Sequence, residues 1–286
     1  MENDSSSMRL TRVTPRRGRA LLANKYELRE LVAVGTLTEL AVAHQPLIDR
    51  QVALDLATGS GRRSPSRSGV RSYFPLEVAK LEHPALAKVY ELGCDADAGA
   101  FVVLEHLDGP TLQEQVTEDG PLRPVDAIAL GRALLEVVAV FHEAGLTHAD
   151  LTPSHVVAGR RGTRLRHHPL RELMASGEGP RSSSYNAPEQ ILREPAKATT
   201  DLFRIASVLF FAMTGAPPFA GDDLDVAVLR GSRPAASQLR SELSRDVDDF
   251  FDRALARDPA DRFGTAAEMR EALRLLALFS GYARHA

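Results

Sequence analysis

The segment LTHADLTPSHVV, at residues 146–157, brings His148, Asp150 and His155 close together in the sequence. The Asp150 carboxylate could accept the proton of a hydroxyl group, which is the role of a general base. The imidazole of His155 could instead bind a transition metal ion. These residue types therefore allow a general base or a metal ligand in this segment.

The segment QVALDLA places another carboxylate, Asp55, in an apolar stretch. Its alternation is typical of a β-strand, with Ala53 and Asp55 on one face and Val52, Leu54 and Leu56 on the other. Asp55 should therefore point from the strand to the same side as Ala53.

The elements that position these residues are strands followed by helices. Alternating apolar patterns predict strands in ELAVAH, QVALDLA, ALAKVYELG and GAFVVLEHL. PLEVAKLEHP predicts a short helix that ends before Pro84. Long buried helices are expected at 125–146 and 199–215, and a capping box formed by Thr265 and Glu268 should open the last helix.

The composition limits the classes of function. The chain has 286 residues, a net charge of −3 and a single cysteine, Cys94. This charge predicts neither nucleic-acid nor membrane binding, and one cysteine fits a reducing compartment. No apolar run approaches the roughly 20 residues that span a bilayer, and the N-terminus lacks the apolar stretch of a signal peptide. We expect a cytoplasmic protein with a disordered basic tail at 1–24 and a short tail at 280–286.

A series of landmarks along residues 26–279 resembles the bacterial eukaryotic-like Ser/Thr protein kinases. In order they are YELRELVAVGTLTELAVA, RQVALDLA, EHPAL, FVVLEHLDG, YNAPEQ, TTDLFRIASVLFFAMTGAPPF and ARDPADRF. LTHADLTPSHVV is similar to the catalytic loop H-R-D-L-x-x-x-N of that family. The resemblance implies an α+β, bilobal protein-kinase-like domain at 25–279. Its N-lobe, at about 25–105, would be a small β-sheet plus one helix, and its larger C-lobe, at about 109–279, would be mostly helical.

Some residues match positions that hold this fold together. The resemblance implies an ion pair between Glu189 and Arg262, and a contact from Asp201 to the backbone of the catalytic loop. His148 would have a structural role in that loop. Asp150 retains the position of the catalytic base.

The lysine position departs from the family pattern. Asp55 stands where the resemblance places the strand lysine that contacts the phosphates, and no lysine lies between Lys25 and Lys80 to replace it. Two unit charges about 4 Å apart interact by about 4 kcal/mol at an effective dielectric constant near 20. An attraction for ATP of that order would become a repulsion.

The metal and regulatory positions depart from the pattern as well. His155 replaces the metal-binding Asn, and His168 falls at the position of the D-F-G Asp, with a register uncertainty of one residue. Ala149 replaces the Arg that would pair with a phosphorylated activation loop. Thr152 replaces the Lys that reaches the transferred phosphate. Mg²⁺ prefers oxygen ligands, so its binding is not expected here.

An apolar pocket for adenine could persist despite these changes. The residues that the resemblance places around it are Gly35, Leu40, Ala53, Leu104, Glu105, Leu107 and Val157. Only Gly35 remains of the glycine-rich loop, which limits the approach of the backbone to phosphates. We therefore expect no required cofactor and, at most, weak ATP binding without metal.

These departures favour a pseudokinase that acts as a protein-binding or allosteric regulatory module. Its partners would be proteins, such as an active kinase or its substrate, and not nucleic acid or membrane. The alternative is an unconventional or residually active Ser/Thr protein kinase that uses Asp150 as its base.

Two hypotheses concern the former phosphate cleft. If the fold is right, Asp55, His155 and His168 converge there and could bind a transition metal, although no metal site is assigned. Alternatively, His168, Arg164 or Arg166 could pair with Asp55 and close the cleft without nucleotide.

Overall fold

A computed structural model describes residues 21–34, 38–57, 77–95, 99–159, 162–166 and 183–279. These residues form two compact units. The first unit contains the described residues up to 80 together with 88–106, and the second contains 81–87 and the described residues of 107–167 and from 183 onward. Each unit has a core of its own, so each is described by itself.

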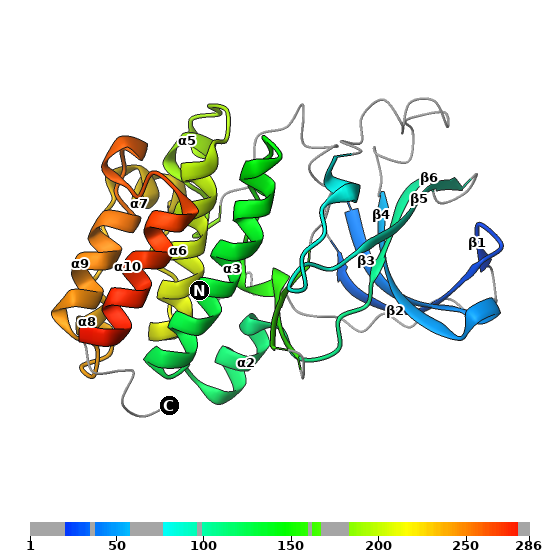
Figure 1. Cartoon of the computed structure of the whole chain (residues 1–286), viewed down its shortest axis with the longest axis horizontal. Helices are drawn as coiled ribbons and strands as arrows, with labels where there is room; N and C mark the ends of the chain where they lie inside the picture. Colours follow the sequence, from blue (N-terminus) through cyan, green and yellow to red (C-terminus); the bar gives the residue numbers. More distant parts are fainter. Residues whose placement is uncertain are drawn as a thin grey trace, which may run out of the picture. The chain divides into compact units, whose positions relative to one another are not determined.

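The first unit is a six-stranded antiparallel sheet with the strand order β1-β2-β3-β4-β6-β5 (Figure 1). Its strands are β1 (Leu21–Leu22), β2 (Tyr26–Val34), β3 (Thr38–Gln45), β4 (Arg50–Ala57), β5 (Val89–Asp95) and β6 (Gly99–Glu105). A 3₁₀ turn, η1 (Pro46–Ile48), joins β3 to β4. The four strands that alternation predicted are confirmed.

The strand β4 has a buried cluster on each face. Val52, Leu54 and Leu56 pack into one cluster with Tyr26 and Phe101. The opposite face carries a second cluster, whose members are Leu40, Ala53, Ala57, Ala100, Val102 and Leu104. The alternation predicted for this strand is therefore confirmed.

Asp55 follows the same alternation. It is paired in register with Leu40 of β3 and Val102 of β6, and it is 0 % exposed. Ala53 and Ala57, its neighbours at two-residue spacing, belong to the cluster that contains Leu40 and Val102. A carboxylate thus stands in the buried stretch of β4, which runs from Val52 to Ala57.

Two predictions for the first unit need correction. The helix expected before Pro84 is, within the described residues, only the 3₁₀ turn η3 (Val78–Lys80), in which Val78 is the buried side chain. Leu21 and Leu22, expected in a disordered tail, form β1. The reason is that Leu22 is buried in the cluster around Tyr26, so an apolar contact keeps this end of the chain on the sheet.

Gly93 of β5 makes room for an aromatic ring. It lies opposite Phe101, and a Cβ atom at this position would lie 2.1 Å from Cζ of that buried ring. Replacement by Ala should therefore lower the free energy of unfolding by about 1–3 kcal/mol, because the ring must move within a packed core. Gly264→Ala is the control, since its Cβ would meet only Glu268 Oε2 at 3.6 Å. Equal urea midpoints for the two variants would contradict this account.

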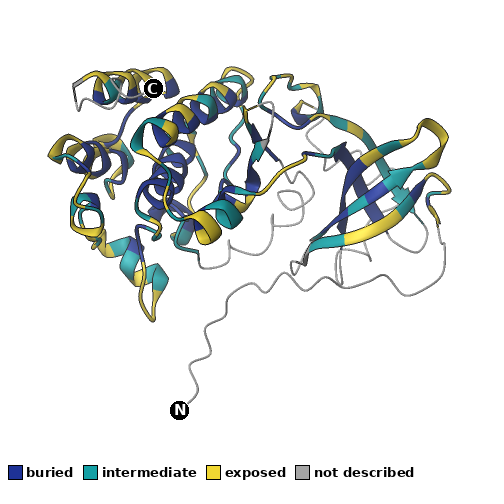
Figure 2. Ribbon diagram, turned by 90° about the horizontal axis from the view of Figure 1, so that it is seen from below, coloured by how far each residue is buried: buried dark blue, intermediate teal, exposed yellow. Residues whose placement is uncertain are grey.

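The second unit consists of helices around one buried helix. The described helices are α2 (Leu112–Asp119), α3 (Pro124–Glu143), α5 (Pro188–Ile191), α6 (Ala198–Thr214), α7 (Leu224–Arg230), α8 (Ala236–Leu239), α9 (Arg245–Ala254) and α10 (Ala266–Phe279). The 3₁₀ turns η4 (Pro153–His155) and η5 (Pro259–Asp261) and the two-stranded sheet of β7 (Val156–Gly159) and β8 (Gly162–Leu165) complete it. Buried positions concentrate on its inner helices (Figure 2).

Helix α6 is the centre of this unit. Every residue from Thr200 to Met213 is buried, which agrees with a sequence that is apolar almost all the way round. The long helices predicted at 125–146 and 199–215 correspond to α3 and α6 and are confirmed. No helix in the described part of the chain combines the length and the apolar character that crossing a membrane requires.

The predicted capping box of α10 is only half formed. The backbone N–H of Glu268 donates to Thr265 Oγ1 at 3.1 Å. The Glu268 carboxylate, however, accepts from the backbone N–H of Gly264 at 2.8 Å, one residue before the expected donor. The helix start is still satisfied, because both side chains accept backbone N–H groups.

Candidate functional site

The loop that contains His148 and Asp150 lies between α3 and β7, and its backbone is held by α6. Asp201, in the first turn of α6, accepts the N–H of His148 at 2.9 Å and the N–H of Ala149 at 2.7 Å. His142 Nε2 lies 2.9 Å from the same carboxylate. Asp201 is 0 % exposed, so this buried carboxylate fixes two consecutive peptide groups of the loop. The backbone contact that the resemblance implied for Asp201 is present.

Ala149 has a left-handed backbone conformation, with φ of 54°. A residue with a Cβ atom pays roughly 1–2 kcal/mol for this conformation. Its N–H is bound by Asp201, and its carbonyl oxygen accepts from Gln190 Nε2 at 2.8 Å. Contacts on both sides of the residue therefore hold the strained backbone.

His148 has contacts that stabilise the loop. Its Nδ1 accepts the N–H of Asp150 at 3.3 Å, which leaves the hydrogen on Nε2 in the neutral ring. The ring is 1 % exposed, and its centroid lies 5.4 Å from that of Phe141 in α3. These contacts are those of a structural residue.

The carboxylate of Asp150 is engaged by a buried arginine from α6. Arg204 Nη2 lies 3.2 Å from Asp150 Oδ1, and Arg204 Nε donates to the carbonyl of Leu151 at 3.1 Å. Arg204 Nη1 donates to Asn186 Oδ1 and to Gln190 Oε1, both at 2.9 Å. One guanidinium thus joins the loop to the segment that begins α5.

Sequence reasoning missed Arg204, although a signal exists. It is a single arginine within the apolar run of the central helix, three residues after Asp201. Residues three apart lie on the same helix face, so both side chains point to the same neighbouring segment. A buried arginine needs acceptors, and Asp150 is one of them.

His155 and Thr152 also have partners inside the loop. His155 Nδ1 lies 2.5 Å from the carbonyl oxygen of Asp150, so Nδ1 must be the protonated nitrogen. The carbonyl of His155 accepts the N–H of Arg166 at 2.7 Å. Thr152 Oγ1 lies 2.9 Å from Ser154 Oγ. These contacts fix the turn η4 and the entry to β7.

The predicted adenine-pocket residues fall into two groups. Leu40, Ala53 and Leu104 share one cluster of the first unit. In the second unit, Leu107 and Val157 pack with Ala87.

Glu105 ends β6, and its backbone N–H donates to the carbonyl of Lys88 at 2.8 Å. Gly35 and His168 lie outside the described residues, and the contributions predicted for them stay predictions.

The hypotheses on the phosphate cleft stay open for the same reason. Within the described residues, no group of three or more His, Cys, Asp or Glu side chains could hold a metal ion. The proposed triad includes His168, so it is not tested. Arg164 Nη2 donates to the carbonyl of Leu86 at 2.9 Å. Burial lowers the pKa of Arg166, and Glu114 raises it less strongly.

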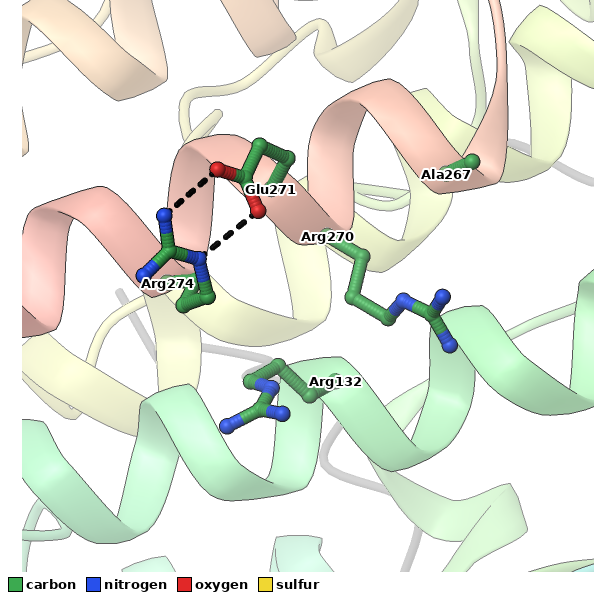
Figure 3. Close-up of a pocket in the computed structure, with 5 residues that line it drawn as sticks. All are labelled: Arg132, Ala267, Arg270, Glu271 and Arg274. Atoms are coloured by element: carbon green, nitrogen blue, oxygen red, sulfur yellow. Dashed lines mark hydrogen bonds and ion pairs between the residues drawn. The ribbon is translucent and has the colours of Figure 1, made fainter.

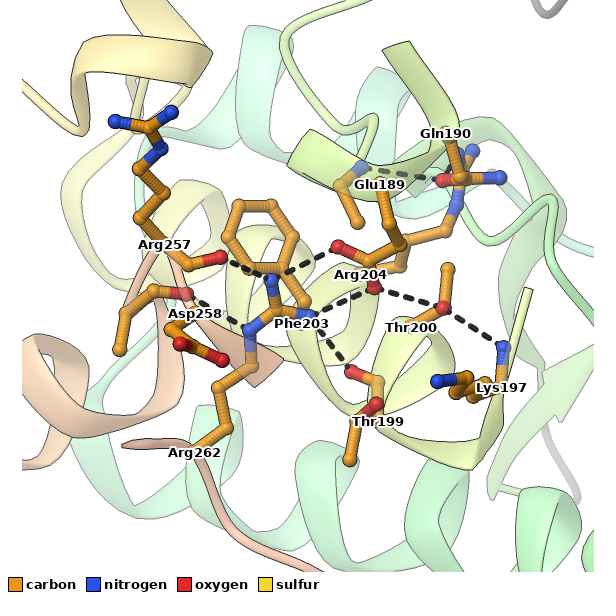
Figure 4. Close-up of polar contacts among 12 residues, drawn as sticks. Glu189, Gln190, Lys197, Thr199, Thr200, Phe203, Arg204, Arg257, Asp258 and Arg262 are labelled. Carbon is orange, nitrogen blue, oxygen red and sulfur yellow. Dashed lines mark hydrogen bonds and ion pairs between the residues drawn. The ribbon is translucent and has the colours of Figure 1, made fainter. Parts of the chain in front are cut away.

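A buried ion pair joins α5 to the segment before α10 (Figure 4). Arg262 Nη1 and Nη2 lie 2.8 and 2.9 Å from the two carboxylate oxygens of Glu189. The remaining N–H groups of Arg262 reach the carbonyls of Ala256, Thr199 and Arg257. The pair that the resemblance implied between Glu189 and Arg262 is therefore present.

The electrostatics of this pair follow from its geometry. Burial would raise the pKa of Glu189, but hydrogen bonds and charge attraction from Arg262, helped by Thr200, bring it below its ordinary value. The Arg262 guanidinium also lies over the Phe203 ring at 4.7 Å. Both side chains are almost fully buried, so the pair acts as one polar unit inside the helical core.

Comparisons with known proteins agree with this architecture. A family model described as "Protein kinase domain" matches residues 76–274. Serine/threonine-protein kinase PknB of Mycobacterium tuberculosis is 30 % identical over 264 residues, which cover 87 % of this chain and 42 % of PknB. Serine/threonine-protein kinase PksC of Streptomyces coelicolor is 30 % identical over 283 residues, covering 92 % and 51 %. The chain thus spans about half or less of the length of these relatives.

A solved structure shows the same fold. The crystal structure of the Mycobacterium tuberculosis PknI kinase domain superposes with a TM-score of 0.73 at 22 % identity, covering 92 % of this chain and 100 % of that one. The bilobal fold class predicted from the sequence is confirmed. The family model spans most of the sequence, and the chain therefore belongs to the protein kinase domain family, among the bacterial eukaryotic-like Ser/Thr protein kinases.

Proposed function

We propose that this chain is a pseudokinase, a kinase-fold module that binds or regulates a partner protein without efficient phosphoryl transfer. The observation that carries the proposal is Asp55, a fully buried carboxylate in β4 at the position where the family resemblance implies a lysine. Catalysis of phosphoryl transfer consists largely of positioning and neutralising the phosphates. A carboxylate at this position opposes both tasks.

The contacts of Asp150 support the same proposal. One of its carboxylate oxygens lies 3.2 Å from the buried Arg204, and its backbone carbonyl accepts from His155. A general base needs a carboxylate that can reach the proton of the substrate hydroxyl. The contacts to Arg204 and His155 give Asp150 a structural reason to be present without catalysis.

A thermal-shift titration with ATP tests the nucleotide part of the proposal. A ligand present at about 100 times its Kd stabilises a protein by about 2.7 kcal/mol, which raises Tm by about 5–10 °C for a domain of this size. We expect millimolar ATP to leave Tm unchanged with or without Mg²⁺. Asp55→Lys is the matched variant, because it restores the charge that attracts phosphate. ATP should raise the Tm of Asp55→Lys, and it should raise the Tm of Asp55→Asn by a smaller amount.

A transfer assay tests the chemistry directly. With labelled ATP and either Mg²⁺ or Mn²⁺, we expect no incorporation into the chain or into a general protein substrate. Incorporation that disappears in Asp150→Asn would refute the proposal and favour a residually active Ser/Thr kinase. Incorporation that persists in this variant would come from a contaminating kinase, which a second purification would remove.

The proposed partners are proteins, such as an active Ser/Thr kinase or one of its substrates. The support is that the relatives PknB and PksC are named serine/threonine-protein kinases. A module without phosphoryl-transfer activity would affect such a kinase or its substrate by binding to it. No cofactor is needed for that role.

A further inference from the structure

A shallow groove between α3 and α10 is lined mainly by arginines (Figure 3). Its volume is about 320 Å³, and its lining residues are Arg132, Ala267, Arg270, Glu271 and Arg274. Arg132 comes from α3, and the other lining residues come from α10. The small side chain of Ala267 leaves space at one end.

The packing of the two helices sets the width of this groove. A Cβ atom on Gly131 would lie 2.7 Å from Leu209 Cδ1 of α6 and 3.0 Å from Leu273 Cδ1 of α10. Because that atom is absent, α3 can approach α6 and α10 closely. Arg132, the next residue, is thereby held opposite the arginines of α10.

The three arginines differ in how strongly they are paired with carboxylates. Arg274 forms two hydrogen bonds with Glu271, at 2.7 and 2.8 Å, which use only part of its donor set. Arg270 contacts Glu136 at 3.3 Å, and both side chains are nearly half exposed, so this pair is weak. Arg132 is exposed and has no ion pair within the described part of the chain. Around the groove, three guanidinium groups share two carboxylates, Glu271 and Glu136, which leaves one positive charge uncompensated among the described residues.

An apolar strip continues the groove along α10. Leu278 follows Arg274 by four residues, and Leu275 follows Glu271 by four, so both lie one turn further on the same side. They are 53 % and 37 % exposed. An arginine cluster beside exposed leucines suits a peptide segment that carries an anionic group next to an apolar side chain.

We propose that this groove binds a phosphorylated Ser or Thr residue of a protein partner. A phosphoryl group carries about two negative charges and three acceptor oxygens, which match the planar, forked donors of several arginines. The phosphate would pair with Arg132 and Arg270, and Arg274 would add its remaining donors. The choice of a phosphorylated protein rests on the proposed function, in which the partner is a Ser/Thr kinase or its substrate.

A nucleic acid fits these observations less well. Its binding surfaces spread many positive charges along a backbone, whereas this chain has a net charge of −3 and the groove is local. One phosphate beside an apolar residue fits the local cluster of three arginines and the leucines that follow it on α10. A nucleic acid is therefore an outcome for the test to detect.

The test measures fluorescence anisotropy with a library of labelled peptides that has phosphothreonine at the centre and degenerate flanks. We expect the phosphorylated library to bind at least about tenfold more tightly than its unphosphorylated counterpart. Arg132→Gln and Arg270→Gln should each weaken binding by about tenfold or more. Arg245→Gln, which removes an exposed arginine at the start of α9, should leave the affinity unchanged. Unchanged Tm values show that the variants are folded.

Three results would overturn the proposal. They are equal binding of the two libraries, unchanged binding by both groove variants, and equal competition by an oligonucleotide of the same charge. None of them depends on the ATP experiments, so the groove and the pseudokinase proposal can fail separately. Phosphoryl transfer by this chain would refute the latter and leave a positive peptide result standing.

Discussion

Arg262→Met should lower the free energy of unfolding by about 3–5 kcal/mol, because it leaves the buried Glu189 carboxylate without its counter-ion. The substitution also removes the donors for the carbonyls of Ala256, Thr199 and Arg257. For a domain of this size the change corresponds to a drop in Tm of roughly 10 °C. Differential scanning calorimetry and urea titration measure it.

The matched control is Arg123→Met. Arg123 pairs with Asp126 on the surface of α3, and the two side chains are 66 % and 47 % exposed. Exposed pairs contribute little, so this variant should unfold close to the wild-type temperature. Equal effects of the two substitutions would show that burial of the Glu189–Arg262 pair is irrelevant to stability. A double variant that replaces both partners with apolar residues should recover part of the loss.

The same pair predicts a pH dependence. The pKa of Glu189 is lowered in the folded protein from its ordinary value of 4.5. A carboxylate of this kind contributes its full stabilisation above about pH 4.5, and the contribution disappears as the pH falls through the lower, folded value. The wild-type protein should therefore lose stability below pH 4.5, and Arg262→Met should lose less over that range.

Arg204→Met should lower the free energy of unfolding by about 3 kcal/mol or more and loosen the loop that contains Asp150. The reason is that one guanidinium serves acceptors on Asp150, Leu151, Asn186 and Gln190, and the loss of a buried partner leaves each acceptor with a penalty of about 1–3 kcal/mol. Urea titration gives the stability. Hydrogen exchange of peptides covering residues 146–155 should show faster exchange.

A double-mutant cycle with Asp150→Asn separates the ion pair from general damage. Residues in direct contact usually show coupling energies of about 0.5–3 kcal/mol, and we expect a value in this range. Arg204→Lys is the conservative variant, since it keeps the charge but loses the forked geometry, and its effect should be intermediate. Additive effects of the two single substitutions would mean that Arg204 stabilises the loop through its other acceptors, Leu151, Asn186 and Gln190.

The sequence predicted the parts of the fold that repeat with a period. The strand β4 alternates strictly, so both of its buried faces could be read from the order of its residues. Helix α6 is apolar almost all the way round, which predicts a buried helix whatever surrounds it. The prediction of a helix before Pro84 was wrong, because a short apolar pattern cannot distinguish an α-helix from one 3₁₀ turn.

The polar contacts of the loop could be predicted only in part. Asp201, Glu189 and Arg262 came from the resemblance to a family, since nothing in their local sequence names their partners. Arg204 was missed because its acceptors lie on two segments outside α6, 150–151 and 186–190, which only the fold brings together. The local sequence shows a single arginine in an apolar helix, but its set of partners is a property of the tertiary structure.

Ala149 has a consequence for how this loop can evolve. Its left-handed backbone is held from outside, by Asp201 on one side and by Gln190 on the other, and not by its own side chain. The side chain at position 149 can therefore change over generations while the path of the chain stays the same. The backbone conformation at this position is therefore kept as long as Gln190 and Asp201 are kept, whatever the chemical character of the side chain at 149.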